Sequence, residues 1–227
     1  MTGPTEANSV LSGGGSVVSS AASATVPIEA VASVTAPCFD FTTGPGFDFA
    51  TGPMPGLCVF DLDWTLWPFD CGVEVLGPFT KWPDCGIIDR YGRPANPHKD
   101  VCAIMAALVD ANVPIAIASR NPGVYGLESL LRAITLKCKR GSLSLWDAIA
   151  PRCFHAYSSD RTGGKNKHFA ALRLASGVMF NQMVFFDDMP DNILMAKKQG
   201  TVSCQVSKNG LTWHALNDTL LAWRQRH

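Results

Sequence analysis

No lysine, arginine or histidine precedes Lys81 in this chain of 227 residues. A secretory leader has a positive segment before its apolar core, and a mitochondrial presequence is rich in arginine, so neither is expected. No stretch approaches the roughly 20 apolar residues of a membrane span. The formal net charge is +0, a balance that predicts neither a nucleic-acid partner nor a membrane partner.

The sequence also lacks a C-x-x-C pair, although it contains eight cysteines. Several of them, such as Cys58, Cys102 and Cys153, lie in apolar runs, where cysteine acts as a small buried hydrophobe. Reduced thiols in a cytoplasmic protein are therefore expected. The alternative is a disulfide between Cys71 and Cys85, facing each other across a hairpin.

Residues 1–55 differ from the rest of the chain because they are rich in small residues and proline and contain no lysine or arginine. They have little apolar surface to offset the entropy of ordering, so the composition predicts a low-complexity, disordered tail. Residues 56–227 are long enough for one well-packed domain.

A tandem repeat lies inside this tail. Residues 39–45 read FDFTTGP and residues 47–53 read FDFATGP. Two units cannot form a solenoid, so a duplication in a loosely constrained linker is the simpler interpretation. Alternatively, the four phenylalanines of the repeat dock on the surface of the domain.

Beyond the tail, short apolar runs alternate with segments of helical periodicity. The expected strands are 57–60, 113–118, 153–157, 183–186 and 202–206. The expected helices are 100–110, 124–136, 165–175, 191–199 and 211–225. This alternation predicts an α/β fold with a doubly wound, five-stranded, Rossmann-like parallel sheet.

The segment between the first strand and the first helix is rich in proline, glycine and tryptophan. No helix of useful length fits residues 67–97, whereas a small β-hairpin flap does, with residues 87–93 as one arm. We expect this flap to lie over the carboxyl end of the first strand, where it could cover a substrate.

Two aspartates, Asp61 and Asp63, directly follow the first strand. Ligands of open α/β sheets bind at the carboxyl ends of the strands. Two carboxylates there are costly to bury unless a cation or a proton meets them. A strand end capped by two solvated aspartates is the alternative.

Polar residues also follow the other strands. Ser119 and Arg120 come after the second strand and could bind phosphate, or act as a helix cap and a surface arginine. Lys165 opens a helix, where a positive charge opposes the helix dipole. This misfit favours Lys165, and not Lys167, as the functional lysine. The surrounding sequence does not fit a P-loop. Asp187 and Asp188 follow the fourth strand, and their carboxylates are oxygen ligands of the kind that magnesium prefers.

The sequence from Asp61 to Thr65 resembles motif I of the haloacid dehalogenase (HAD) superfamily. The resemblance implies that Asp61 is a nucleophile and that Asp63 is a general acid and base whose backbone carbonyl helps to hold magnesium. It further implies that Leu62 and Thr65 contribute to phosphate or substrate binding. True dehalogenases lack the second aspartate, so Asp63 favours phosphoryl transfer.

The remaining motifs resemble the same superfamily in the same order. Ser119 and Arg120 match motif II, and Lys165 matches motif III, whose lysine neutralises the nucleophile and the phosphoryl oxygens. In motif IV, the resemblance implies that Asp188 is a direct metal ligand and that Asp187 supports it. The sequence VFDLDWTLWPF at 59–69 is similar to the signature of the eukaryotic magnesium-dependent phosphatase-1 family.

These resemblances imply a magnesium-dependent phosphatase that acts through an aspartyl phosphate on phosphotyrosine-type or sugar-phosphate substrates. The expected partners are a phosphorylated small molecule or a phosphoprotein. A non-catalytic scaffold with the same fold is the alternative, although such a module has no need for Asp61, Asp63, Lys165 and Asp188 together. A phosphomutase or kinase-like transferase ranks last, because neither a second large cap nor a nucleotide loop is visible.

Overall fold

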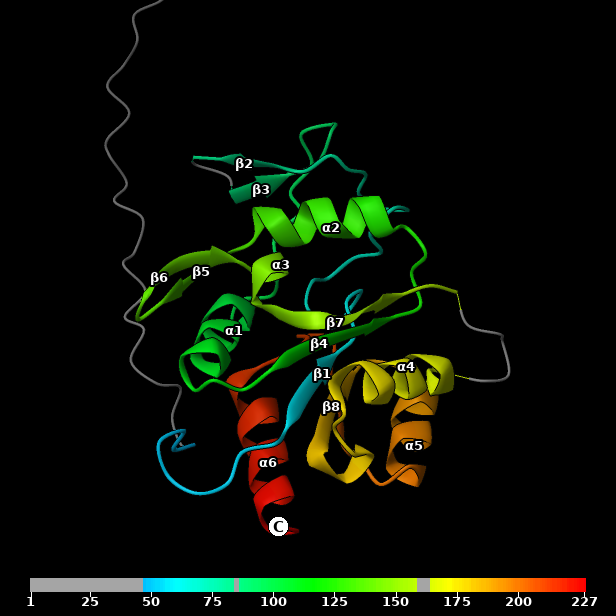
Figure 1. The fold of residues 1–227 in the computed structure, drawn as a ribbon. Helices are drawn as coiled ribbons and strands as arrows, with labels where there is room; N and C mark the ends of the chain where they lie inside the picture. The colour runs from blue at the N-terminus through cyan, green and yellow to red at the C-terminus, as the bar shows by residue number, and fades with distance from the viewer. Residues whose placement is uncertain (1–46, 84–85, 159–163) are drawn as a thin grey trace, which may run out of the picture. The chain divides into compact units, whose positions relative to one another are not determined.

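The computed structural model describes residues 47–83, 86–158 and 164–227 (Figure 1). The first copy of the repeat, residues 39–45, and the predicted tail up to residue 46 lie outside the described residues. So does Cys85, whereas Cys71 is a free thiol. Among the described residues, no helix combines the length and apolar character needed to cross a membrane.

A five-stranded parallel sheet in the order β7-β4-β1-β8-β9 forms the centre of the described domain. Its strands are β1 (Leu57–Phe60), β4 (Ile115–Ser119), β7 (Ile149–Ala156), β8 (Met183–Asp187) and β9 (Val202–Gln205). Every residue of β1, β4 and β8 is buried, as expected for parallel strands covered on both faces. The predicted doubly wound α/β fold is confirmed.

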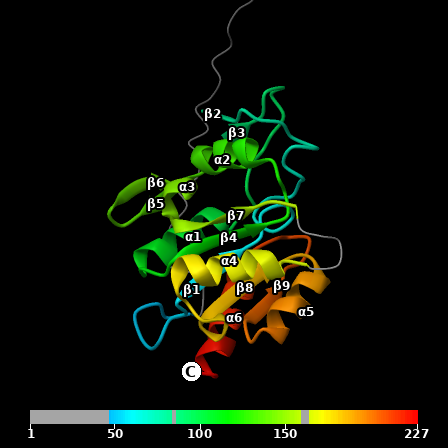
Figure 2. The same cartoon turned by 45° about the vertical axis from the view of Figure 1, so that its right-hand side comes forward.

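Helices cover both faces of this sheet. The larger ones are α1 (Val101–Asp110), α2 (Val124–Ala133), α4 (Asn166–Ser176), α5 (Pro190–Lys198) and α6 (Trp213–Arg224). Alternate β1 side chains point to opposite faces, so Phe60 packs in one apolar cluster with α1, α2 and α6, and Val59 in another with α4 and α5. Figure 2 shows α4 and α5 in front of the strands.

The helix predicted over 124–136 ends earlier, at Ala133. Ile134 is extended, and a hairpin follows, formed by β5 (Thr135–Cys138) and β6 (Gly141–Ser144). The two β-branched residues Ile134 and Thr135 favour this extended backbone. The short helix α3 (Leu145–Ala148) then leads into β7, which begins at Ile149, four residues before the expected start.

The insert between β1 and α1 contains a hairpin of β2 (Thr80–Trp82) and β3 (Gly86–Ile88). The predicted arm over 87–93 ends at Ile88, because buried Asp89 organises a turn. Its carboxylate accepts hydrogen bonds from the backbone N–H groups of Leu76, Tyr91 and Arg93. It also forms an ion pair with the Arg93 guanidinium. The chain just before β2 contacts α2, where the Phe79 N–H donates to the Ser129 hydroxyl.

Residues 47–55 pack against the domain, although their composition predicts a tail. Phe47 is only 5% exposed and belongs to the main apolar cluster. Phe49 packs edge-to-face on Trp213 of α6. The docking alternative therefore holds for the second copy of the repeat.

Candidate active site

The carboxyl ends of β1 and β8 bring two aspartates together. The strands pair in parallel with Phe60 opposite Phe186, so Asp61 and Asp187 follow at neighbouring positions. The Asp61 N–H donates to the Phe186 carbonyl oxygen at 2.9 Å, which extends the pairing by one step. Both side chains are buried, at 7% and 0% exposure, so their charges need partners.

Lys165 supplies the positive charge for both carboxylates. It lies at the N-cap of α4, is 1% exposed, and its ammonium group contacts Asp61 Oδ1 and, at 2.6 Å, Asp187 Oδ2. A lysine at this helix end opposes the dipole, and the ion pairs explain why it is tolerated there. Lys167, two residues later, is exposed.

Asp187 is held by further donors. Asn192 in the first turns of α5 donates its amide to both oxygens of Asp187 at 3.0 Å, and the Met189 N–H donates to Oδ1 at 2.8 Å. We call Asp61, Lys165, Asp187 and Asn192 the ionic cluster. With this many donors, the Asp187 carboxylate is fixed in one orientation.

Asp188 completes an acidic group at the edge of the ionic cluster. One carboxylate oxygen from each of Asp61, Asp187 and Asp188 lies within 4.8 Å of the others. Asp188 is half-buried, and its side chain makes none of the hydrogen bonds that hold Asp187. Three carboxylates at this spacing offer the oxygen ligands that magnesium prefers.

The pKa values reflect this crowding. Burial raises the pKa of Asp61 to about 7, with Asp187 adding repulsion and Lys165 opposing both. Burial and the neighbouring Asp187 raise the pKa of Asp188. Burial disfavours the charged form of Lys165, but Asp61 and Asp187 outweigh it and raise the pKa of the ammonium group. Like charges gathered in this way are a common property of catalytic sites.

Asp63 has a different set of partners, all of them uncharged. Its Oδ1 accepts from the Trp67 indole at 2.7 Å and the Cys71 N–H at 3.0 Å, and its Oδ2 accepts from the Asn121 amide at 2.8 Å. We call Asp63, Trp67, Cys71 and Asn121 the neutral cluster. Burial raises the pKa of Asp63, although these hydrogen bonds oppose the rise. A carboxyl group of this kind is suited to carry a proton.

The end of β4 lies beside the neutral cluster. Ser119 is buried and its hydroxyl accepts from the Asn121 N–H at 3.2 Å. The Ser119 carbonyl oxygen lies 2.7 Å from Nε2 of His168, a buried residue of α4. Arg120 is exposed at the same strand end.

The predicted residues therefore gather at one edge of the sheet, with Arg120 at its surface. Thr65 is buried and its hydroxyl lies 3.4 Å from Asp61 Oδ2, while the Leu62 side chain is fully buried in the apolar core. Asp191 is an exposed acid in the first turn of α5.

Sequence reasoning missed four residues that hold these side chains: Trp67, Asn121, His168 and Asn192. Asn121 lies two residues beyond the end of β4, and Asn192 lies five residues beyond the end of β8, in the first turn of α5. Closeness to a strand end was their one local sign, and neither side chain is charged.

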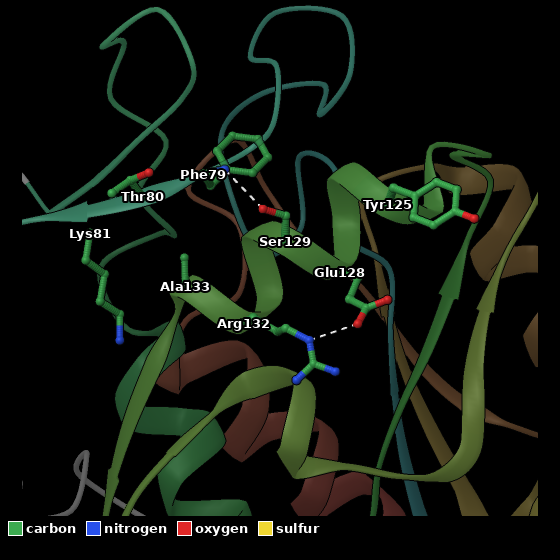
Figure 3. A pocket seen from close by; sticks show the side chains of 8 residues that line it. All are labelled: Phe79, Thr80, Lys81, Tyr125, Glu128, Ser129, Arg132 and Ala133. Carbon is green, nitrogen blue, oxygen red and sulfur yellow. Dashed lines mark hydrogen bonds and ion pairs between the residues drawn. The ribbon is translucent and has the colours of Figure 1, made fainter.

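The insert also forms a cavity, of about 830 Å³, with α2. It is lined by Phe79, Thr80 and Lys81 on one side and by five residues of α2, including Tyr125 and Arg132, on the other (Figure 3). Arg132 is paired there with Glu128. None of the predicted site residues lines this cavity, so we do not assign the chemistry to it.

Comparison with known proteins agrees with this geometry. Residues 53–226 match the family model described as Acid Phosphatase. The chain is 34% identical over 167 residues to human Magnesium-dependent phosphatase 1, covering 74% of this chain and 86% of that protein. It is 31% identical over 159 residues to a HAD-like hydrolase superfamily protein of Schizosaccharomyces pombe, covering 69% of this chain and 89% of the relative.

The chain therefore belongs to the acid phosphatase family of the HAD-like hydrolase superfamily. Among solved structures, the fold is similar to the N-terminal part of a Bacteroides fragilis protein that contains a phosphatase domain, complexed with Mg. The TM-score is 0.50 at 18% identity, over 74% of this chain and 41% of that one. This likeness supports the shared fold.

Proposed function

We propose that this phosphatase hydrolyses phosphomonoesters through an aspartyl phosphate on Asp61, with magnesium as cofactor. The observation that carries the proposal is the ionic cluster, in which Lys165 contacts both Asp61 and Asp187 at the carboxyl end of the central strand. Buried ion pairs often contribute no more to stability than apolar packing would, so three buried charged groups at a strand end favour a catalytic role.

The donor set fits a magnesium ion. Asp61 and Asp188 would offer carboxylate oxygens and Asp63 its backbone carbonyl, while Asp187 would support the site from its bonds to Lys165 and Asn192. Bound there, magnesium neutralises the clustered carboxylates and the phosphoryl oxygens. The related human protein is named for its magnesium dependence, and the Bacteroides fragilis structure contains Mg.

The chain's own groups account for both half-reactions. A carboxylate oxygen of Asp61 attacks phosphorus, the ester P–O bond breaks, and the leaving oxygen takes the proton of Asp63. Asp63 then takes a proton from water as that water attacks the acyl phosphate, which frees Asp61 and inorganic phosphate. Buried Lys165 and Ser119 would orient the phosphoryl oxygens, and exposed Arg120 would contact the rest of the substrate.

The proposed substrate class rests on the resemblance of the sequence motifs and on the small insert. We propose phosphotyrosine-type or sugar-phosphate substrates, carried by a small molecule or a protein. Within the described residues the insert contributes a three-residue strand pair beside α2. A small insert of this kind leaves room for a bulky phosphoester.

The experiment is a phosphate-release screen of an aryl phosphate, a phosphotyrosine peptide and sugar phosphates, each in magnesium and in EDTA. Turnover should require magnesium. Acid quenching during turnover should trap a protein-bound phosphate that hydroxylamine removes, and the Asp61→Asn variant should trap none. Equal rates in magnesium and EDTA would contradict the role of magnesium as cofactor. Equal trapping of phosphate by the wild type and by Asp61→Asn would contradict the assignment of Asp61 as the nucleophile.

A further inference from the structure

The second copy of the repeat occupies a defined seat on α6, formed by Trp213 and Arg224. The Arg224 guanidinium lies 3.9 Å from the centre of the Phe47 ring, a cation–π contact, and the Phe47 side chain is buried. Phe49 packs edge-to-face on Trp213, with ring centres 6.5 Å apart, and on Phe47 at 5.0 Å. Both phenylalanines of this copy therefore contribute to the contact.

Arg224 also forms hydrogen bonds with the backbone of the segment. Its Nε donates to the Pro53 carbonyl oxygen and its terminal nitrogen to the Asp48 carbonyl oxygen, both at 2.9 Å. The Asp48 carboxylate closes a turn by accepting from the Ala50 N–H at 2.7 Å and the Thr51 hydroxyl at 2.5 Å. The seat thus recognises one particular turn of the chain as well as two rings.

Gly52 completes this turn in a left-handed conformation, with φ of +80°. A Cβ atom at this position would lie 3.5 Å from Arg224 and would require a strained backbone. Glycine therefore suits the turn, whereas the space beside the guanidinium would admit a Cβ atom at ordinary contact distance.

The first copy of the repeat carries every side chain that makes these contacts. Residues 39–45 differ from residues 47–53 at one position, where Thr42 replaces Ala50. Ala50 is exposed and contributes only its N–H, so a threonine fits there equally well. Outside the repeat, Arg224 also contacts the Met54 sulfur at 3.3 Å, and the equivalent residue after the first copy is Gly46.

We propose that the seat on α6 is a recognition site for the sequence Phe-Asp-Phe-x-Thr-Gly-Pro, and that the first copy of the same chain takes the seat whenever the second copy leaves it. The exchange shifts the chain by eight residues, the period of the repeat. It adds those residues to the loop before β1, and loop closure becomes only slowly less favourable with length. The missing Met54 contact leaves the second copy as the preferred occupant.

The test compares three variants of the full chain. One replaces Phe47 and Phe49 with alanine, the second replaces Phe39 and Phe41, and the third replaces all four. The melting temperature of the first variant should fall below that of the wild type by less than half of the decrease seen in the fourfold variant, because the first copy takes over. The variant at Phe39 and Phe41 should melt like the wild type, because its preferred occupant is intact.

Two further measurements separate the outcomes. If the variant at Phe47 and Phe49 melts like the fourfold variant, or if neither differs from the wild type, the exchange is refuted. Adding Arg224→Ala to the variant at Phe47 and Phe49 should bring it to the level of the fourfold variant, and its failure to do so would refute recognition by this seat. If the melting temperature of the variant at Phe47 and Phe49 rises with protein concentration, the first copy binds to a second molecule, and the exchange within one chain is refuted.

Discussion

The two aspartates of the Asp-x-Asp motif are two residues apart but have opposite surroundings. Asp61 contacts the Lys165 ammonium group beside Asp187, and it is buried in the ionic cluster. Asp63 accepts three hydrogen bonds from uncharged donors, one of them Asn121. At the first site a positive charge opposes the cost of burying the carboxylate, whereas no cation of the described residues contacts the second carboxyl group.

The difference shows how one strand end provides two kinds of carboxylate. A nucleophile must be ionised to attack, and the Lys165 cation opposes the burial that raises the pKa of Asp61. A proton donor needs a raised pKa and a fixed orientation, which burial and neutral hydrogen bonds give together. We therefore expect substitutions in the ionic cluster to have larger effects than those in the neutral cluster.

The largest effect is expected for Asp61→Asn. Loss of the nucleophile should lower turnover of an aryl phosphate by at least about a thousandfold, equivalent to about 4 kcal/mol of barrier. Stability should change little, because Lys165 keeps its ion pair with Asp187 and one crowded negative charge is removed. The matched control is Asp191→Asn, an exposed carboxylate on α5, which should keep wild-type turnover. Turnover of Asp61→Asn within tenfold of the control would contradict the assignment.

The next largest effect concerns Lys165 and the metal. Lys165→Met leaves two buried carboxylates without their cation, a change that costs about 3–5 kcal/mol in comparable buried pairs. Magnesium should still raise the melting temperature of this variant, since the carboxylates remain and a bound ion stabilises the folded state. Asp188→Ala should lose most of that rise.

Magnesium titrations of thermal stability in the wild type and both variants measure this difference. Lys167→Met is the control, since Lys167 is exposed on the same helix, and it should behave like the wild type. If Lys165→Met loses the response to magnesium while Asp188→Ala keeps it, our assignment of the metal and phosphate positions is wrong.

The ionic cluster was more predictable from the sequence than the neutral one. Asp61, Lys165 and Asp187 each directly follow a strand or open a helix, and a charge at such a place is unusual enough to be noticed. Asn121 and Trp67 carry no such signal, because asparagine is common in loops and tryptophan in cores. Their role depends on where the insert returns to the sheet, which no local pattern encodes.

The same reasoning applies to the fold. Apolar strands such as β1 and β8 were located closely, since burial on both faces leaves a continuous apolar run. The hairpin of β5 and β6 was missed because Ile134 and Leu136 continue the apolar spacing of α2 in sequence. The docking of Phe47 was only an alternative, because composition describes residues 47–55 and cannot show the Arg224 contact that holds them.

A smaller effect is expected for Asn121→Ala in the neutral cluster. The substitution removes the amide that donates to Asp63 Oδ2 and to the Cys71 carbonyl oxygen. Asp63 keeps its bonds to Trp67 and Cys71, so turnover should fall by only about tenfold, below the hundredfold that misplacing a catalytic group can cost. The measurement is kcat and KM for an aryl phosphate, with kcat lowered and KM little changed. A loss as large as that of Asp61→Asn would abolish the contrast between the two clusters.

The last effect concerns stability and not turnover, and it involves His168, which links α4 to the end of β4. Its Nε2 lies 2.7 Å from the Ser119 carbonyl oxygen and 3.2 Å from that of Tyr157, so Nε2 carries the proton and the neutral ring is favoured. Burial, assisted by Lys165, lowers the pKa of His168 to about 4 from the ordinary 6.5. The unfolded chain therefore takes up a proton at this site first as the pH falls, so the contribution of His168 to the free energy of unfolding should decrease between about pH 7 and pH 4. Asp61, whose folded pKa is raised to about 7, contributes with the opposite sign over the same range.

Urea denaturation across this pH range, in the wild type and in His168→Gln, tests that sign. Glutamine can keep a donor near the Ser119 carbonyl oxygen and does not titrate, so the wild type should lose stability relative to the variant on acidification. The variant should still depend on pH, because burial lowers the pKa values of His98 and His155 and raises those of Asp61, Asp63 and Asp188, two groups of opposite effect that both proteins share. Equal pH dependence in the two proteins would show that His168 titrates alike in the folded and unfolded chains, and a steeper decrease in the variant would reverse the sign of the linkage.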